Sequence, residues 1–205
     1  MVQVHHVRND MLISPGKIQL SRSRQTGQAN ACEIMLMCRD GRNLHHARDC
    51  MTAIKEFTRQ HKWAYALGVF AEMPHRSLSP TVINYGAVIN ACSKGEQWLR
   101  ALGMAGRMRE QVVEPDLICY SAIINACAKG EHWSKAFAAL ADMQDHDLEP
   151  NQISYNALIS ACEKGEQWQR ALDILSTMHR EGLEPDVISY NAAISACEKG
   201  GQWKR

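Results

Sequence analysis

The sequence predicts an all-α protein, an α-solenoid in which 35-residue helix-turn-helix repeats stack into a right-handed superhelix. Three observations predict this fold: residues recur at one fixed period, apolar residues within each period have helical spacing, and glycine or proline separates the helical stretches. The period is clearest for tryptophan, because all five tryptophans lie 35 residues apart. They are Trp63, Trp98, Trp133, Trp168 and Trp203.

Four further residue types keep the same 35-residue step. They are Tyr85, Tyr120, Tyr155 and Tyr190; Cys92, Cys127, Cys162 and Cys197; Lys94, Lys129, Lys164 and Lys199; and Pro80, Pro115, Pro150 and Pro185. Cutting the chain after each Pro-Asp or Pro-Asn pair gives full units at 82–116, 117–151 and 152–186 and a truncated unit at 187–205. Because the chain ends just inside a second helix, we expect it to be a fragment of a longer array.

The residues before the first full unit are less regular. Residues 47–81 form a degenerate repeat, in which Trp63 keeps the period but Cys50 occupies the position of the tyrosine. Residues 1–46 do not follow the 35-residue period. We expect them to be an N-terminal leader, either disordered or a transit peptide.

Each full unit contains two stretches of helical spacing. In unit 152–186 the first stretch has apolar residues at i, i+3, i+4 and i+7, namely Tyr155, Leu158, Ile159 and Cys162. The second stretch has an apolar stripe formed by Trp168, Ala171, Leu172, Leu175 and Met178. Each unit is therefore predicted to be a helical hairpin, and stacking covers the apolar faces that one hairpin leaves exposed.

The boundaries of the helices also have sequence signals. Gly95, Gly130 and Gly165 are expected to end the first helices in a left-handed conformation. Proline followed by Asp or Asn stops each second helix, since proline biases the residue before it to extended geometry. The N-caps of the following helices are expected at Asn84, Ser154 and Ser189.

The composition excludes several classes of protein. Hydrophobic residues make up 45% of the 205 residues and charged residues 22%, which is too apolar for a disordered chain. No run of 18 apolar residues is present to span a membrane. The formal net charge of +1 gives no bulk attraction to nucleic acid or lipid. The start, residues 1–6, lacks the apolar core of a secretion signal, so we expect a reducing compartment.

The spacing of the cysteines and histidines favours a role in core packing over metal binding or catalysis. Four of the eight cysteines repeat once per unit on an apolar face, which favours small buried side chains over metal ligands or disulfides. Cys32 and Cys38 lack histidines at zinc-site spacing. The tryptophans have the helical spacing of core residues. No nucleotide-binding loop, serine elbow or cluster of carboxylates occurs, so we expect no catalytic residues, metal or cofactor.

The repeated segments resemble those of a known family. Residues 187–192, Val-Ile-Ser-Tyr-Asn-Ala, and residues 183–186, Leu-Glu-Pro-Asp, are similar to the start and the end of pentatricopeptide repeats. The resemblance covers residues 82–205 well and 47–81 weakly. The tryptophan ladder departs from the family, which usually has a smaller aliphatic residue there, and we expect this to alter helix packing.

The resemblance implies an RNA-binding function with one repeat for each base. Members bind single-stranded RNA, mostly in mitochondria and chloroplasts, where they act in mRNA processing, stability or translation. The residue after the tyrosine and the last residue of the unit would contact the base edge. These pairs are Gly86 with Asp116, Ser121 with Asn151, and Asn156 with Asp186, and Asn191 has no partner within the chain. The second residue of each unit would pack against the bases: Ile83, Ile118, Ile153 and Ile188.

The same resemblance predicts a preferred RNA. In the family, a Ser and Asn pair selects adenine and an Asn and Asp pair selects uracil. Gly86 has no side-chain donor, so the base of its unit is undetermined. The family binds RNA with its N-terminal repeat toward the 5′ end, and the expected target is therefore 5′-N-A-U-Y-3′.

The lysine ladder has two interpretations. Lys94, Lys129, Lys164 and Lys199 lie at the expected ends of first helices, where a cation complements the helix dipole. With the family resemblance added, phosphate contact is favoured. Residues 82–186 nevertheless contain 9 Lys and Arg against 15 Asp and Glu, a net charge of −6, so RNA binding requires the acidic residues to lie on the other face.

Two further hypotheses concern partners and location. The acidic balance of the full units also suits a protein-interaction scaffold of the tetratricopeptide type, whose groove holds a peptide. The leader has Arg8, Lys17, Arg22 and Arg24 against Asp10 among scattered serines, which favours an organelle transit peptide for mitochondrion or chloroplast.

Overall fold

The computed structural model describes residues 46–201, and this part of the chain is built from α-helices alone. Residues 1–45 and 202–205, which include the basic leader, Cys32, Cys38 and Trp203, lie outside the described residues. The helices are α2 (Ala47–Arg59), α3 (Trp63–His75), α4 (Val82–Lys94), α5 (Trp98–Glu110), α6 (Leu117–Lys129), α7 (Trp133–Asp145), α8 (Gln152–Lys164), α9 (Trp168–Arg180) and α10 (Val187–Lys199).

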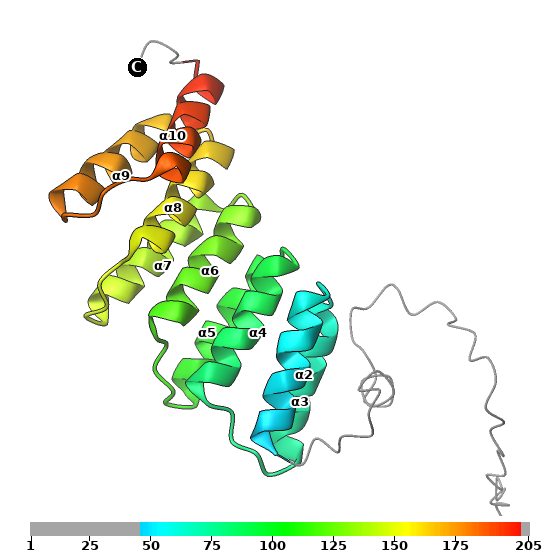
Figure 1. Cartoon of the computed structure of the whole chain (residues 1–205). Coiled ribbons are helices and arrows are strands. Elements are labelled where there is room, and N and C mark those ends of the chain that lie inside the picture. Colours follow the sequence, from blue (N-terminus) through cyan, green and yellow to red (C-terminus); the bar gives the residue numbers. More distant parts are fainter. Residues whose placement is uncertain (1–45, 202–205) are drawn as a thin grey trace, which may run out of the picture.

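The helices form two layers (Figure 1). The first helices of the hairpins, α2, α4, α6, α8 and α10, pack side by side in chain order. The second helices α3, α5, α7 and α9 each pack against their own first helix and that of the next hairpin, and neighbouring second helices meet only through long side chains such as Arg109 of α5 and Asp142 of α7 within the described residues. Because the first helices are closer together, the array curves toward their layer, which is its inner face. The predicted all-α solenoid is thus the observed architecture.

Each first helix begins immediately after a polar N-cap residue in extended conformation. These residues are Thr81, Asp116, Asn151 and Asp186. A side-chain oxygen of Asp116 accepts the backbone N–H of Cys119 at 2.8 Å, and Asp186 accepts that of Ser189 at 2.9 Å. The prediction that Asn84, Ser154 and Ser189 are N-caps is wrong, because the helices begin three residues earlier and these residues lie in the first turn, where Asn84 accepts the N–H of Thr81 at 2.9 Å.

The glycines that follow the first helices are not left-handed. Gly95, Gly130 and Gly165 have φ of −88°, −79° and −87°, so that prediction is also wrong. The left-handed residue is the next one, and it is Glu96, Glu131 or Glu166. Glycine is needed here for a different reason, which is the close approach of a tryptophan.

Each of these glycines lies against the tryptophan of the preceding hairpin. A Cβ atom would be 2.2 Å from Cδ1 of Trp63 at Gly95 and 2.5 Å from Cδ1 of Trp98 at Gly130. The two later joints repeat this geometry at 2.3 Å, for Gly165 with Trp133 and Gly200 with Trp168. A side chain cannot fit at such separations. The tryptophan and glycine ladders are therefore two halves of one joint between hairpins.

The tryptophans are partly buried at these joints, packed against the core as expected from their spacing. Arginines of the following hairpin cover two of them: the Arg100 guanidinium lies 4.9 Å from the ring centroid of Trp63, and that of Arg170 lies 4.7 Å from that of Trp133. Such cation–π contacts add to the apolar packing.

The cysteine ladder lies in the core. Cys92, Cys127, Cys162 and Cys197 are all buried, and none of these four forms a disulfide. Burial raises the pKa of Cys92 and Cys127 to about 11 and that of Cys162 to about 12. These thiols are therefore uncharged near neutral pH and pack as small apolar side chains.

Candidate functional site

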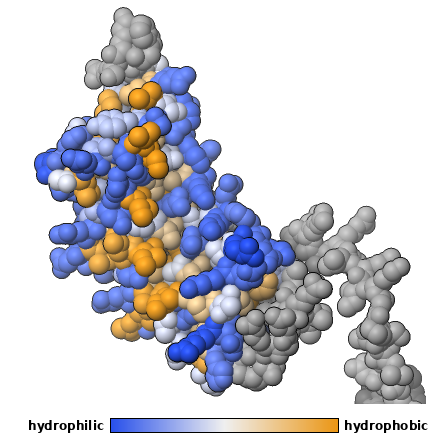
Figure 2. Space-filling view, in the orientation of Figure 1, coloured by the Kyte–Doolittle hydropathy of each residue, from blue (hydrophilic) through white to orange (hydrophobic). Residues whose placement is uncertain are grey.

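Large apolar side chains are exposed on the first-helix layer. They are the second residues of the first helices, Ile83, Ile118, Ile153 and Ile188, and they are between 63% and 68% exposed. Apolar side chains recur from hairpin to hairpin along the face that Figure 2 shows. A regular ladder of exposed isoleucines has no role in the core, and it gives this surface evenly spaced apolar contacts.

The predicted base-edge residues lie beside these isoleucines. Ser121 and Asn156 are one turn further along the same helices, while Asn151 and Asp186 cap the helices that follow. In unit 152–186 the two members of the pair touch, since Nδ2 of Asn156 donates to Oδ1 of Asp186 at 3.2 Å. Sequence positions 30 residues apart thus form one polar site.

In unit 117–151 the pair is linked through the serine of the next helix. The hydroxyls of Ser121 and Ser154 lie 3.0 Å apart, and the Ser154 hydroxyl donates to Oδ1 of Asn151 at 3.1 Å. Asn151 also accepts the N–H of Ser154 at 3.0 Å. The cap bonds use Oδ1 of Asn151 and do not engage its Nδ2 amide.

Asp186 is held in its charged form. The backbone N–H of Ser189 lowers the pKa of this carboxyl below its ordinary value, with further bonds from the Ser189 hydroxyl and Asn156. Asp186 therefore acts as a hydrogen-bond acceptor at neutral pH. Asn191, the remaining predicted residue, is exposed on α10, and its unit has no described closing residue.

A groove of about 340 Å³ runs along the layer at unit 82–116. It brings together the predicted residues of that unit, which are Ile83, Gly86, Lys94 and Asp116, with Ile118 of the next unit. An isoleucine, a polar cap and a lysine therefore share one surface recess. The site residues that were predicted one by one from the 35-residue period are therefore neighbours in space.

Several residues of this groove were not predicted as site residues from the sequence. Lys55 and Arg59 of α2 and Asn90 of α4 line it as well. The period contained the signal, because Arg59 lies 35 residues before Lys94 and Lys55 lies 35 residues before Asn90. The degenerate unit 47–81 thus contributes two cations to the groove.

The lysine ladder runs along the C-terminal ends of the first helices, and each lysine is the last residue of its helix. Nζ of Lys164 donates to the backbone carbonyl of Lys129, at the end of α6, at 3.4 Å. Nζ of Lys199 lies 3.1 Å from Oε1 of Glu163. Burial raises the pKa of Glu163, but the bonds from Ser195 and Lys199 outweigh it and keep the pKa below its ordinary value. The lysines therefore complement helix ends, and Lys94 also lines the groove.

Most acidic residues of the full units lie outside the first helices. Of the 15 Asp and Glu in residues 82–186, Asp116 and Asp186 are caps and Glu163 lies in a first helix, while the other 12 lie in second helices, turns or loops. The first helices α4, α6 and α8 carry three lysines against that one glutamate. The net charge of −6 therefore does not describe the inner face.

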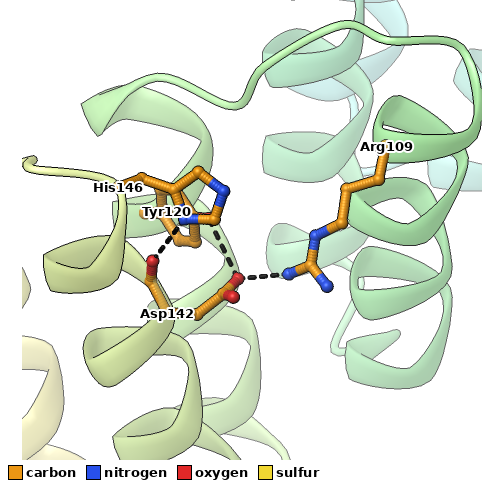
Figure 3. A network of polar contacts seen from close by, with 4 residues as sticks. All are labelled: Arg109, Tyr120, Asp142 and His146. Atoms are coloured by element: carbon orange, nitrogen blue, oxygen red, sulfur yellow. Dashed lines mark hydrogen bonds and ion pairs between the residues drawn. The ribbon is translucent and has the colours of Figure 1, made fainter.

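Polar contacts on the other layer tie the hairpins together (Figure 3). Arg109 of α5 forms an ion pair with Asp142 of α7, and the Tyr120 hydroxyl of α6 donates to the same carboxylate at 2.9 Å. Nδ1 of His146 lies 2.7 Å from the carbonyl oxygen of Asp142. Burial, with Asp142 beside it, raises the pKa of Tyr120 to about 12. This network supports the array and lies away from the groove.

Within residues 46–201, His, Cys, Asp and Glu form no group of three that could hold a metal ion. None of the described helices has the length and hydropathy needed to cross a bilayer.

Comparison with known proteins gives consistent matches. A family model described as the pentatricopeptide repeat domain matches residues 46–95, 99–130 and 139–199, and one described as the PPR repeat matches residues 83–111 and 118–148. No curated protein matches the sequence significantly.

Solved structures with the same fold are pentatricopeptide repeat proteins. PPR10 in complex with an 18-nt psaJ RNA element matches with a TM-score of 0.70 and 25% identity, over 84% of this chain and 26% of that chain. PPR10 from maize matches with the same TM-score and identity over 84% and 25%. The chain thus spans about a quarter of their length. The PPR domain of Arabidopsis thaliana PRORP1, in complex with tRNA, shares the fold at a TM-score of 0.63 and 13% identity, over 75% of this chain and 84% of that chain.

Proposed function

Because this chain belongs to the pentatricopeptide repeat family, we propose that it binds single-stranded RNA along its first-helix layer, with one base for each hairpin. The observation that supports this most is the groove of unit 82–116, where exposed isoleucines flank a polar cap beside a lysine. Apolar side chains contact base faces, acceptors and donors read base edges, and cations contact phosphates.

The proposed sequence preference is 5′-N-A-U-Y-3′. Ser121 with Asn151 takes adenine and Asn156 with Asp186 takes uracil, with Ile118, Ile153 and Ile188 packed against the bases. The contact of Asn156 with Asp186 supports this assignment, because it presents both side chains at one site. Equal affinity for this RNA and for its complement would reject the preference.

The proposed activity is binding without chemistry. RNA bound in this way is shielded from nucleases or presented to other factors. The binding thereby acts in mRNA processing, stability or translation. The proposed role of Lys94, Lys129, Lys164 and Lys199 is contact with phosphates, with Arg59 in the same register.

Salt titration tests the phosphate contacts. We expect the affinity for a short labelled RNA to fall with salt, and Lys129→Ala and Lys164→Ala each to reduce the slope of log K against log salt by about 0.7. Lys135→Ala is the matched control, because Lys135 is exposed on the second helix α7 and should leave the slope unchanged.

The same titration separates RNA binding from a protein scaffold. If no RNA binds at low salt, the groove is better explained as a peptide site of the tetratricopeptide type. A slope that changes equally with Lys135→Ala would show that the lysines act only through total charge.

We also propose a mitochondrial or chloroplast location. The support is the basic composition of residues 1–46. Fusing residues 1–46 to a fluorescent protein should direct it into one of these organelles, and a diffuse signal would reject the proposal.

A further inference from the structure

The helix α2 of the degenerate unit 47–81 contributes a lysine that the other first helices lack. Lys55 lines the groove of about 340 Å³ together with Lys94 of α4. At the 35-residue period, the position of Lys55 is held by uncharged residues in the other described first helices, which are Asn90, Asn125, Ser160 and Ser195. The groove therefore has a second lysine on the helix that faces Lys94.

The same helix lacks the residue types proposed to contact bases. Arg48, which is exposed, occupies the position of the exposed isoleucines. Met51 occupies the position of Ser121 and Asn156, and a thioether has no hydrogen-bond donor and is a weak acceptor. The proposed base sites of the described residues therefore begin at unit 82–116, next to the two lysines.

Lys55 is free to contact an anion. Its side chain is exposed, and among the described residues it has no hydrogen-bond or ion-pair partner. Arg59, the other cation of α2 in the groove, is engaged, because its guanidinium donates to both carboxylate oxygens of Glu56, at 2.7 Å and 3.1 Å. The charge available to a ligand thus comes from Lys55 and Lys94.

The carboxylate of the groove lies far from Lys94. Asp116 caps α6 beside the start of α4, where Sγ of Cys119 is 3.9 Å from the carbonyl oxygen of Val82. Lys94 is the last residue of α4, about 18 Å further along that helix at 1.5 Å per residue. An anion at the lysine end of the groove is therefore not repelled at close range by Asp116.

We propose that Lys55 and Lys94 bind a phosphate at the 5′ end of the RNA, an inference that rests on the proposed RNA-binding function. In the proposed orientation the 5′ nucleotide lies opposite unit 82–116, so its 5′ oxygen points toward α2. A terminal phosphomonoester carries a charge of about −1.5 to −2 at pH 7, whereas a phosphodiester within the chain carries a single negative charge. Two lysines on neighbouring helices match the larger charge.

The degenerate unit favours a terminal phosphate over an internal one. A further nucleotide on the 5′ side would bring its base to Met51, which offers the base edge no strong hydrogen-bonding partner. Such a nucleotide would also replace the doubly charged monoester by a singly charged diester. Both differences favour an RNA that ends at unit 82–116.

Three RNAs with the same base at N test this proposal. One is 5′-NAUY-3′ with a 5′ hydroxyl, the second is the same RNA with a 5′ monophosphate, and the third has a 5′ hydroxyl and one uridine added before N. We expect the monophosphate to bind at least about 5-fold more tightly than the other two, since one added charge at about 4 Å from a solvated cation has about this effect.

The possible outcomes separate the proposals. Equal affinity for the second and third RNAs would overturn the preference for a terminal phosphate, and a monophosphate that adds no affinity would overturn the phosphate site. Failure of all three RNAs to bind would instead overturn RNA binding itself.

Lys55→Asn tests the assigned residue. It installs the residue type that α4 and α6 have at this position, and because Lys55 is exposed the urea midpoint should stay near that of the wild type. The gain from the 5′ monophosphate should largely disappear, with the affinity for the 5′-hydroxyl RNA unchanged.

Lys135→Asn is the matched control, because Lys135 is exposed on the second helix α7. It should keep the full gain from the 5′ monophosphate. Retention of the full gain in Lys55→Asn, or an equal loss in Lys135→Asn, would overturn the assignment of Lys55.

Discussion

Glycine at the end of each first helix leaves room for the tryptophan of the preceding hairpin. The contact recurs at the four described joints with nearly the same distances, from 2.2 to 2.5 Å for an added Cβ. The tight contact that repeats in every unit is possible because one residue, the glycine, has no side chain. At the scale of single residues, the pairing explains why both ladders keep the same period.

Gly130→Ala is predicted to destabilise the protein by about 1–3 kcal/mol, the usual cost of overpacking. Its Cβ would lie 2.5 Å from Cδ1 of Trp98. Urea unfolding measures the change as a shift in midpoint. Gly103→Ala is the control: Gly103 lies in α5 with nothing within 4 Å of an added Cβ, so alanine there should stabilise by about 0.5–1 kcal/mol.

A double-mutant cycle identifies the partner. In a Trp98→Ala background, Gly130→Ala should cost much less, because the clashing indole is gone. The same cost in both backgrounds would assign the role of Gly130 to backbone conformation instead.

The buried thiols predict a loss of stability at alkaline pH. Burial raises the pKa of Cys92 and Cys127 from 9.0 to about 11, and that of Cys119 and Cys162 to about 12. Below pH 9.0 both states hold the proton, and above it the unfolded thiols ionise first, so stability falls as pH rises toward the folded pKa. Each thiol contributes about 1.4 kcal/mol per pH unit in that window.

Thermal unfolding in reducing buffer between about pH 8 and about pH 10 checks this prediction. Cys127→Ala should lower stability at the lower pH but reduce the slope against pH. An unchanged slope would mean that the thiol ionises equally in both states.

The caps at the start of the first helices serve two purposes at the scale of elements. Asp116, Asn151 and Asp186 satisfy free N–H groups of α6, α8 and α10, and they also stand at the proposed base sites. The hydrogen bonds of the cap hold each side chain in a defined position. A residue that is fixed by its helix needs no further support to present its outer atoms to a base.

Two substitutions at Asn151 separate capping from base reading. Asn151→Ala removes the bond to Ser154 and should cost about 1 kcal/mol of stability. Asn151→Asp keeps the cap, so its unfolding midpoint should stay near that of the wild type, while its RNA preference moves from adenine to guanine. RNA titration and urea unfolding on the same samples measure both effects, and an unchanged adenine preference in Asn151→Asp would contradict base reading at this position.

Charge is distributed by layer at the scale of the whole molecule. The sum of +1 combines a basic leader, an acidic set of full units and a lysine ladder. Since second helices and loops hold 12 of the 15 acidic residues in residues 82–186, the inner face presents lysines to a ligand. Contacts between neighbouring hairpins, including the ion pair of Arg109 with Asp142, stabilise such an array in one dimension.

Periodicity was enough to predict the solenoid, the two helices of each unit and the buried cysteines. Apolar spacing at 3.6 residues and a fixed 35-residue step report on helices and on stacking, which depend on local pattern. The same step placed Ile83, Ile118, Ile153 and Ile188 at equivalent positions, and the structure exposes all four.

The tertiary structure decided what the residues at the boundaries do. Asn84, Ser154 and Ser189 are typical capping residues by type, but in the structure the helices begin three residues earlier, after caps such as Asn151 and Asp186. Gly95, Gly130 and Gly165 are of the residue type that suits a left-handed helix end. Glycine is required at these positions because a tryptophan 32 residues earlier in the sequence packs against each of them. A residue's local preference allows several roles, and contacts between hairpins select one of them because packing tolerates no overlap.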